Sequence, residues 1–401
     1  MKILIDGQTL LTPDIKRGIG TYFRHTVENV LANDLSNDFY LNTRAGDHLD
    51  HLSPWTREKL CLIDAPARDN HSPSQSRPED LKKRYSDALN NEIDKRGIDV
   101  YWSPNGLMDN VFLPEREVSS CRFAVTIFDL IVLVMAREYA KHLSASALAS
   151  YKKKLRVLEE DYDLFFHISQ HTQSDFTSRL RVGDKQHVVT PLAADSSFRP
   201  YPFPTVLAEK DYVVYTGGLD PRKNMDRALE AFAALHDRYS ADRRIGNTEL
   251  VVVCVMDDAA RTRMLRRTGR LGLNGKVTFT GFIDDAALVE LYQKARCLFF
   301  PSLYEGFGLP ILEGLACGLP VVAANTSSLP EVGREWANYF DPLNIEEMAD
   351  SLYQTLQAPM DLQSRLARYE YSKNFSWQKT ARATLEAIED SVDQARRKSV
   401  A

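Results

Sequence analysis

Two glutamates flank a glycine-bearing turn in the C-terminal half of this sequence. Glu305 precedes the turn Gly306-Phe307-Gly308, and Glu313 follows it, in what we predict to be the first turn of a helix. Pro310 suits a helix start and Gly318 a helix end, so the helix is short and its N-terminus faces the turn. Free backbone N–H groups there bind an anion such as phosphate, whereas carboxylates accept hydrogen bonds from sugar hydroxyls. This stretch therefore offers groups for both parts of a sugar nucleotide.

A second glycine turn leads to two cations. Gly217 and Gly218 follow a predicted strand, Tyr212 to Thr216, and precede Arg222 and Lys223. Arginine and lysine at such a turn can hold a diphosphate through charge-assisted hydrogen bonds. A pair of surface cations is the alternative interpretation.

A third glycine pair, Gly18 and Gly20, lies where the first predicted helix begins. Close approach of the backbone to a phosphate and a simple glycine-permitted turn explain it equally well. The sequence contains neither the dinucleotide-binding pattern G-x-G-x-x-G nor the P-loop pattern G-x-x-x-x-G-K-[ST].

Asp129 stands near the C-terminal end of a predicted strand, Phe123 to Leu130, where open α/β sheets place ligand residues. Asp161-Tyr162-Asp163 matches the D-x-D pattern of metal-dependent sugar transferases. This triplet precedes the strand that begins at Leu164, so it lies at the opposite end of the sheet. We therefore predict no metal site at the triplet.

Strand-like runs alternate with predicted helices along the chain, which indicates the α/β class with parallel, doubly wound sheets. A chain of 401 residues is long enough for two domains. The stretch containing Pro200, Pro202 and Pro204 lacks periodicity and is the best linker. The predicted parts are a Rossmann-like domain over 1–195, a linker over 196–209, a second Rossmann-like domain over 210–375, and a C-terminal helix over 376–401 that packs back towards the first domain.

Composition excludes several classes of protein. A net charge of −5 gives no reason to expect a nucleic-acid partner, and the five scattered cysteines indicate neither a zinc site nor a disulfide framework. The chain begins directly with an apolar strand, and no apolar run approaches the roughly 20 residues that span a membrane, so we expect a cytoplasmic protein. The basic cluster Lys152-Lys153-Lys154 with Arg156 has two interpretations. It is either a solvated helix face or a surface attracted to anionic lipid on the inner face of the plasma membrane.

The motifs together resemble those of retaining glycosyltransferases of family 4, which have the two-domain GT-B fold. The resemblance covers nearly the whole chain and rests on the E-x₇-E pattern of Glu305 and Glu313, on segments 217–224 and 325–332, and on the glycine loop 18–20. It implies that Glu305 holds the transferred sugar, that Glu313 takes the ribose hydroxyls, and that the cations neutralise the diphosphate. The implied catalytic residues are Glu305, Asp129, Arg222 and Lys223. The implied donor-binding residues are Gly18, Gly20, Gly217, Gly218, Gly306, Phe307, Gly308, Leu309, Glu313, Ser327, Ser328 and Leu329.

The resemblance implies a retaining transfer of a hexose, without metal or other cofactor, from a nucleotide-sugar to a hydroxyl of a glycan or lipid-linked acceptor. The second domain would bind the donor and the first domain the acceptor. Segments 17–22 and 221–224 resemble those of bacterial mannosyl- and rhamnosyltransferases of polysaccharide and lipopolysaccharide assembly, which favours GDP-mannose. Many relatives carry His-Asp where this chain has Phe128-Asp129, so the histidine that contacts the sugar has no counterpart here.

Three alternatives stay open from the sequence. The first is a transferase that uses a UDP-sugar carrying glucose, galactose or an N-acetylhexosamine. The second is a phosphorylase- or epimerase-like enzyme on the same scaffold. The third is a non-catalytic protein that binds sugar nucleotides, against which the presence of both glutamates and both cations argues.

Overall fold

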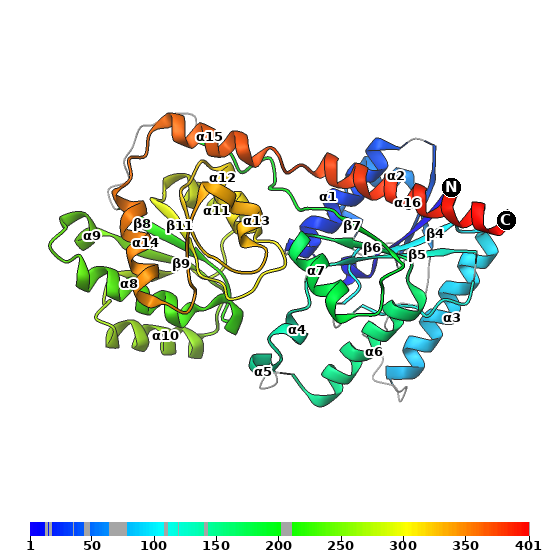
Figure 1. The fold of residues 1–401 in the computed structure, drawn as a ribbon, viewed down its shortest axis with the longest axis horizontal. Helices are drawn as coiled ribbons and strands as arrows, with labels where there is room; N and C mark the ends of the chain where they lie inside the picture. The colour runs from blue at the N-terminus through cyan, green and yellow to red at the C-terminus, as the bar shows by residue number, and fades with distance from the viewer. Residues whose placement is uncertain are drawn as a thin grey trace. The chain divides into compact units, whose positions relative to one another are not determined.

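The computed structural model describes residues 1–12, 15, 18–34, 36–43, 49–63, 78–107, 111–118, 120–139, 143–201 and 211–400 (Figure 1). The chain divides into two compact units. Unit 1 consists of Met1–Leu192 and Ser376–Ala401, and unit 2 consists of Ala193–Phe375. Most of the predicted linker, 196–209, falls outside the described residues, so its bounds stay a prediction.

Unit 1 is built on a parallel sheet with the strand order β3-β2-β1-β4-β5-β6-β7. Its strands are β1 Lys2–Asp6, β2 Asp38–Asn42, β3 Leu60–Ile63, β4 Val100–Ser103, β5 Arg122–Ile127, β6 Leu164–His167 and β7 Gln186–Val189. Its α-helices are α1 Gly18–Asn33, α2 Pro54–Lys59, α3 Pro78–Arg96, α4 Ile131–Val134, α5 Ala136–Tyr139, α6 Ala145–Asp161, α7 Gln170–Arg179 and α16 Trp377–Val400. The central strands are buried on both faces, which is why they read as continuous apolar runs.

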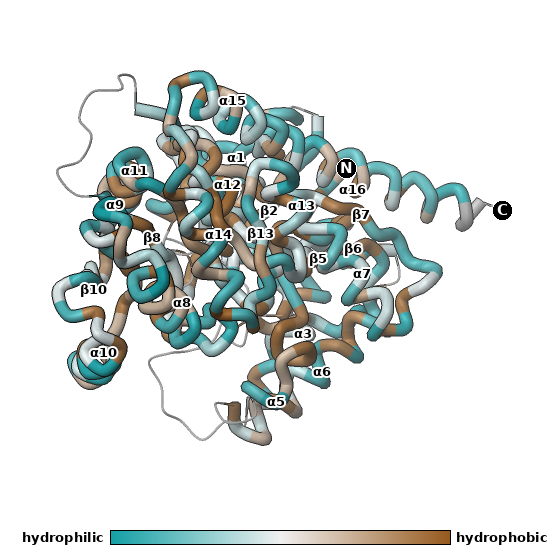
Figure 2. Tube along the Cα trace, turned by 60° about the vertical axis from the view of Figure 1, so that its left-hand side comes forward, coloured by the Kyte–Doolittle hydropathy of each residue, from teal (hydrophilic) through white to brown (hydrophobic). Residues whose placement is uncertain are grey.

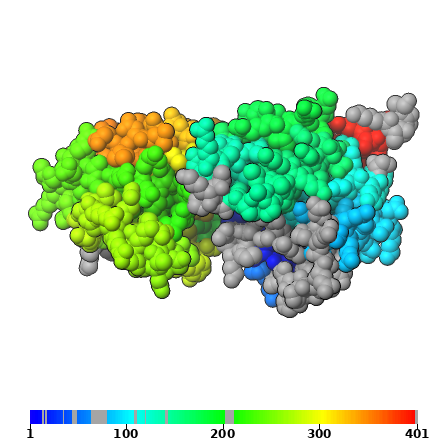
Figure 3. Space-filling model, turned by 90° about the horizontal axis from the view of Figure 1, so that it is seen from below, coloured from blue at the N-terminus to red at the C-terminus, as the bar shows by residue number. Residues whose placement is uncertain are grey.

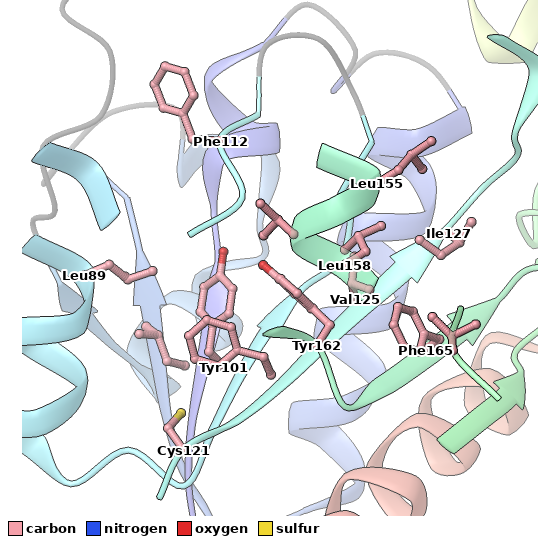
Figure 4. Close-up of a cluster of buried hydrophobic side chains, with 14 of the residues drawn as sticks. Leu89, Tyr101, Phe112, Cys121, Val125, Ile127, Leu155, Leu158, Tyr162 and Phe165 are labelled. Atoms are coloured by element: carbon pink, nitrogen blue, oxygen red, sulfur yellow. The ribbon is translucent and has the colours of Figure 1, made fainter. Parts of the chain in front are cut away.

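Alternate residues along the strands of unit 1 contribute their side chains to two separate cores, because successive side chains point to opposite faces of a sheet. On one face, Leu89 of α3, Tyr101 of β4, and Leu155 and Leu158 of α6 pack in a single cluster (Figure 4). On the other face, α1 packs against α16 over a core that includes Trp102. The C-terminal helix therefore belongs to the first domain, as predicted.

Unit 2 contains a second parallel sheet, with the strand order β10-β9-β8-β11-β12-β13. Its strands are β8 Tyr212–Thr216, β9 Glu249–Val253, β10 Val277–Phe279, β11 Cys297–Phe300, β12 Val321–Ala324 and β13 Ala337–Phe340. Its α-helices are α8 Met225–Arg238, α9 Arg243–Asn247, α10 Asp258–Arg270, α11 Asp285–Lys294, α12 Leu309–Ala316, α13 Leu329–Gly333, α14 Ile345–Gln357 and α15 Leu362–Ser372. The prediction of two doubly wound parallel sheets is confirmed.

Helix α10 was not predicted from the sequence. Its thirteen residues include five arginines, and only Ala260, Met264 and Thr268 are buried, so the apolar stripe that marks a helix is very narrow. The helix lies on the surface of unit 2 (Figure 3). The longest helix, α16, is mostly hydrophilic towards its C-terminal end (Figure 2). Within the described part of the chain, no helix is both long and apolar enough to cross a membrane.

A buried polar network fixes the carboxyl end of β1. Asp6 is 2% exposed and accepts hydrogen bonds from Tyr101 Oη at 2.8 Å and from Gln8 Nε2 at 2.8 Å. Burial raises the pKa of Asp6 to about 6, although these hydrogen bonds oppose the change. Gln8 also exchanges hydrogen bonds with the backbone of Phe112, so the network ties the loop after β1 to segment 111–118.

Candidate active site

Glu305, Arg222 and Lys223 form a buried charged cluster in unit 2, which we call the Glu305 cluster. Lys223 Nζ lies 2.6 Å from Glu305 Oε1, and the Arg222 guanidinium donates to Glu305 Oε2. The side chains of Glu305 and Lys223 are 10% and 14% exposed. Asp220 Oδ2 lies 3.5 Å from Arg222 Nε, so the cluster and its neighbour carry two cations and two carboxylates.

The two cations hold Glu305 ionised. Burial by itself would raise the pKa of Glu305, but the positive charges of Lys223 and Arg222 outweigh it and lower the pKa. Burial lowers the pKa of Lys223, and the charge of Glu305 opposes that effect. The Lys223 ammonium also lies 5.1 Å from the centre of the Phe300 ring. Taking one partner away would leave a buried charge without compensation.

The chain brings these residues together at the carboxyl ends of adjacent strands β8 and β11. The N–H of Leu303 donates to the Arg222 carbonyl at 2.7 Å, which ties the two loops directly. Asn224 adopts the left-handed conformation with φ of 59°, and its Nδ2 donates to the carbonyls of Pro301 and Pro342. The segment after β8 is therefore held against the segment after β11, and this fixes the cations beside Glu305.

Two serines hold the backbone of Glu305. Its N–H donates to Ser327 Oγ at 3.0 Å, and its carbonyl accepts from Ser328 Oγ at 2.8 Å. The N–H of Leu329 donates to the Thr326 carbonyl at 3.2 Å. The sequence predicted Ser327, Ser328 and Leu329 as donors to phosphate. In this structure the serine side chains hold the glutamate, and the Leu329 N–H is already in a hydrogen bond.

The turn after Glu305 presents open backbone donors. Among the described residues, the backbone N–H groups of Phe307, Gly308 and Leu309 meet no acceptor. They lie where α12 begins, and the positive end of the helix dipole favours an anion there. Phe307 itself is 4% exposed, so its side chain is packed inside unit 2.

Gly308 is required by the backbone, whereas Gly218 is not. Gly308 has φ of 104°, and a Cβ added there would lie 2.7 Å from Leu329 Cδ2. At Gly218 the nearest atom to an added Cβ is 3.8 Å away. We expect Gly308→Ala to lower the free energy of unfolding by about 1–3 kcal/mol, because it combines a strained φ with a clash. The unfolding free energy of Gly218→Ala, measured in urea, should stay within about 0.5 kcal/mol of the wild-type value. Any loss of donor affinity in that variant would then reflect a changed contact between the donor and position 218, not a loss of stability. Equal stability losses in the two variants would contradict this account.

Glu313 lies in the second turn of α12, not in the first as predicted, because the helix begins at Leu309. It is half-buried. Burial, followed by the negative charges of Asp285 and Asp195, raises the pKa of Glu313 to about 8. The carboxyl group is therefore protonated at neutral pH, and it can donate a hydrogen bond as well as accept one.

The other predicted site residues belong to unit 1. Asp129 lies just past the end of β5, and its Oδ1 accepts from the N–H of Ile131 at 3.0 Å. A Cβ added to Gly20 would lie 2.0 Å from the carbonyl oxygen of Ile15, so contact with the chain's own backbone explains this glycine. Gly18 is the first residue of α1. Unit 2 thus assembles Glu305, Arg222, Lys223 and both serines, while Asp129, Gly18 and Gly20 stand in the other unit.

The rejected D-x-D triplet has a structural role. Asp163 lies 2.6 Å from Arg116 and 3.0 Å from Arg122, at the N-terminal end of β6. Among the described residues, no group of three His, Cys, Asp or Glu side chains could hold a metal ion.

Three exposed apolar residues of unit 2 were missed from the sequence. Leu219, Val255 and Phe282 follow the adjacent strands β8, β9 and β10 and are 37%, 68% and 76% exposed. Exposed apolar side chains at the carboxyl edge of a parallel sheet offer a flat surface to a ring. The available signal was the position of each residue two or three residues after a strand end, which sequence reasoning used only for polar residues.

Comparison with known proteins gives a family for the C-terminal part of the chain. Residues 200–374 match the family model described as glycosyl transferases group 1. The O-antigen chain mannosyltransferase B of Escherichia coli is 29% identical over 72% of this chain and 73% of its own length. A GDP-mannose-dependent alpha-(1-6)-phosphatidylinositol dimannoside mannosyltransferase of Mycobacterium tuberculosis is 30% identical over 52% of this chain and 53% of its own length.

The fold also matches a solved structure. Anabaena Alr3699/HepE, crystallised with UDP and glucose, has a TM-score of 0.66 and 16% identity, covering 97% of this chain and 99% of that one. This likeness supports the GT-B fold, because both sheets of the chain take part in it. Residues 200–374 therefore form a glycosyl transferases group 1 domain, and the chain is a glycosyltransferase with the GT-B fold.

Proposed function

We propose that this enzyme transfers mannose from GDP-mannose to a hydroxyl of a glycan or lipid-linked acceptor in polysaccharide or lipopolysaccharide synthesis, with retention and without a metal ion. The observation that carries the proposal is the Glu305 cluster, in which two cations converge on one buried carboxylate. A nucleoside diphosphate brings two phosphates that compete for Arg222 and Lys223. Glu305 is then free to accept hydrogen bonds from sugar hydroxyls.

The same residues supply what the departing diphosphate needs. Negative charge develops on the phosphate as the bond to the sugar breaks, and preorganised cations and amides stabilise that charge. Arg222, Lys223 and the open N–H groups of Phe307 and Gly308 would do this without a metal. The acceptor oxygen would bond to the anomeric carbon from the side that the diphosphate leaves, and its proton would pass to a phosphate oxygen. Isolation of a sugar covalently bound to Glu305 or Asp129 would overturn this same-face mechanism.

The choice of mannose and of GDP rests on the relatives. The E. coli and M. tuberculosis proteins are named as mannosyltransferases, and the second is named as dependent on GDP-mannose. The Anabaena structure, in contrast, contains UDP. The exposed ring of Phe282 offers a surface on which a base can stack, and a purine gives the larger contact area. A UDP-sugar donor is therefore the second candidate.

Contact with an anionic membrane stays part of this proposal. Lys152, Lys153 and Arg156 are exposed on α6, whereas Lys154 is 6% exposed and so does not belong to that face. Lys153 Nζ lies 3.8 Å from Glu115, which leaves a weaker basic surface than the sequence indicated.

Donor affinity should rise with pH through the titration of Glu313. Because its pKa is about 8, the group is neutral at pH 6.5 and mostly ionised at pH 9. A carboxylate accepts two ribose hydroxyls better than a protonated carboxyl does. We expect the dissociation constant of GDP to fall about 3- to 10-fold over this range, as one charge-assisted hydrogen bond would give. Calorimetric titration of Glu313→Gln should show little of this change, and an equal pH dependence in both proteins would exclude Glu313 as its source.

A thermal-shift comparison of GDP and UDP tests the donor assignment. A ligand at 100 times its dissociation constant adds about 2.7 kcal/mol to the stability of the state that binds it, which raises the melting temperature by about 5 °C or more. We expect that shift with GDP and a smaller one with UDP. A larger shift with UDP would contradict GDP-mannose as the donor and favour a UDP-sugar. A shift with GDP but no transfer or hydrolysis of GDP-mannose would favour the non-catalytic binding protein.

A further inference from the structure

The segment 259–283 of unit 2 is strongly basic in a chain whose net charge is −5. It contains neither aspartate nor glutamate, and its cations are Arg261, Arg263, Arg266, Arg267, Arg270 and Lys276. All the arginines of the segment lie on α10, the surface helix between β9 and β10 (Figure 3). None of these cations belongs to the candidate active site, so their concentration on one helix calls for another explanation.

Two of the arginines on α10 are held by unit 2 itself. Arg267 pairs with two carboxylates of α8, because its Nε lies 3.0 Å from Asp226 Oδ1 and its Nη2 lies 2.5 Å from Glu230 Oε1. Arg261 Nη1 donates to the carbonyl of Phe279 on β10 at 3.2 Å. These two side chains therefore hold α10 in place against its neighbours.

The other three arginines of α10, Arg263, Arg266 and Arg270, form a group that we call the arginine stripe. All three are exposed, and within the described part of the chain none of them forms an ion pair or a side-chain hydrogen bond. Their spacing of i, i+3 and i+7 places them in one row along the helix, about 10 Å from end to end. The row thus presents three guanidinium groups to an outside partner.

The arginine stripe lines a groove between α10 and α8 with a volume of about 900 Å³. Asp226 and Glu230 lie on the α8 side of this groove, where Arg267 pairs with both of them. Asp258, in the first turn, is the acidic residue of α10. Every cation on the helix is arginine, and the planar guanidinium group matches a phosphate with two parallel hydrogen bonds. The stripe therefore suits a surface that carries phosphate groups.

The basic surface of α6 in unit 1 is weaker than the arginine stripe. Its exposed cations Lys152, Lys153 and Arg156 stand among carboxylates, since Lys153 Nζ lies 3.8 Å from Glu115 Oε1. The hollow beside them is also lined by Glu117, Glu160 and Asp161. Carboxylates repel an anionic surface and offset the attraction of the cations. Segment 259–283 has no such offset, because its next carboxylate along the chain is Asp284.

We propose that α10 docks unit 2 on an anionic membrane, with the arginine stripe against the phosphates of the lipid headgroups. Leu265, which precedes Arg266, is 48% exposed and adds an apolar contact to the electrostatic attraction. The choice of a lipid surface over a soluble polyanion rests on the proposed function, which includes a lipid-linked acceptor. The basic surface itself does not depend on that function.

Sedimentation of the full chain with lipid vesicles tests the proposal. We expect binding to vesicles of phosphatidylcholine and phosphatidylglycerol in a ratio of about 2 to 1, weaker binding at high salt, and none to pure phosphatidylcholine. Arg263→Gln/Arg266→Gln/Arg270→Gln should weaken binding to the anionic vesicles about 30- to 100-fold, because three cations that face the lipid are lost. Undiminished binding by this variant, or no binding by the wild type, would overturn the proposal.

Lys152→Gln/Lys153→Gln/Arg156→Gln is the matched control, because it removes the same number of charges from α6. We expect it to weaken vesicle binding less than about 3-fold. Both triple variants should melt within about 2 °C of the wild type, since all six side chains are exposed. A loss in the control equal to that of the α10 variant would indicate a general effect of net charge. A larger loss would assign the membrane contact to α6, and either result would overturn the proposal.

A fluorescent label reports the contact directly. Cys61 is exposed and the other four cysteines are buried, so Leu265→Cys in a Cys61→Ser background accepts an environment-sensitive dye at one position. Anionic vesicles should shift the emission of this dye to shorter wavelengths and leave unchanged that of the same dye at Lys153→Cys. The reverse result would contradict docking through α10.

Soluble polyphosphate separates a membrane from another polyanion. Binding of polyphosphate through the arginine stripe by a protein that binds no anionic vesicles would overturn the proposal. Vesicle binding through the stripe by a protein without transferase activity would sink the proposed function and keep this inference. Transfer to a soluble acceptor by a protein that binds no vesicles would sink this inference alone.

Discussion

Replacing Glu305 with glutamine is expected to lower kcat/KM for mannose transfer by about 10²- to 10³-fold, which is the usual cost of removing one preorganised polar group from a transition state. Affinity for GDP should be retained or increase. Glutamine keeps the shape of the side chain but removes the charge that competes with the diphosphate for Arg222 and Lys223. Steady-state kinetics and calorimetric titration with GDP measure the two effects separately.

Glu290→Gln is the control for this substitution. Glu290 pairs with Lys294 on the surface of unit 2, and its side chain is 64% exposed, so the same chemical change there should leave transfer and GDP affinity unaltered. A Glu305→Gln enzyme that keeps more than about a tenth of its wild-type kcat/KM would exclude the assigned role of the carboxylate.

Replacing Lys223 with methionine is expected to reduce both stability and activity. The substitution removes one partner of a buried ion pair, which typically costs about 3–5 kcal/mol of unfolding free energy. Transfer should fall about 10³-fold, because a cation that faces the departing diphosphate is lost. Urea unfolding and transfer kinetics measure the two losses. Lys294→Met, in an exposed pair, should cost less than about 1 kcal/mol.

A second substitution separates the two effects of the lysine. In Lys223→Met combined with Glu305→Gln, neither member of the pair carries a charge, so much of the lost stability should return, while activity should not. Recovery of activity together with stability would mean that Lys223 acts only as a structural partner of Glu305. An absence of any stability loss in Lys223→Met alone would contradict the buried ion pair.

The sequence predicted the architecture well, because periodic apolar runs determine it. The predicted class, with two parallel, doubly wound sheets, is the observed one. Helix α10 was missed because it has five arginines and only three buried residues, so its sequence shows almost no apolar periodicity. The network around Asp6 was also missed, since it depends on contacts between residues 95 positions apart, such as Asp6 and Tyr101.

The sequence predicted the individual residues of the candidate site but not the contacts between them. Glu305 was assigned to the sugar and Lys223 to the diphosphate, yet the two side chains form an ion pair across 82 positions of sequence. Strand order places the loops after β8 and β11 side by side, and no local pattern encodes that order. From the sequence, the glycine at position 20 was explained either by a bound phosphate or by a turn. The structure shows a different cause, since the carbonyl of Ile15 leaves no room for a side chain at Gly20. The assigned roles of the site residues stay predictions.

The central claim is that the Glu305 cluster holds a nucleotide-linked mannose and releases the diphosphate without a metal. Its most direct test is NMR of the product formed from GDP-mannose and a mannose-containing acceptor in the presence of EDTA. We expect wild-type enzyme to form a mannoside with the same anomeric configuration as the donor, and Glu305→Gln to form at least about 100 times less in the same time. A product of inverted configuration, a requirement for a divalent metal, or equal product from Glu305→Gln would contradict the account.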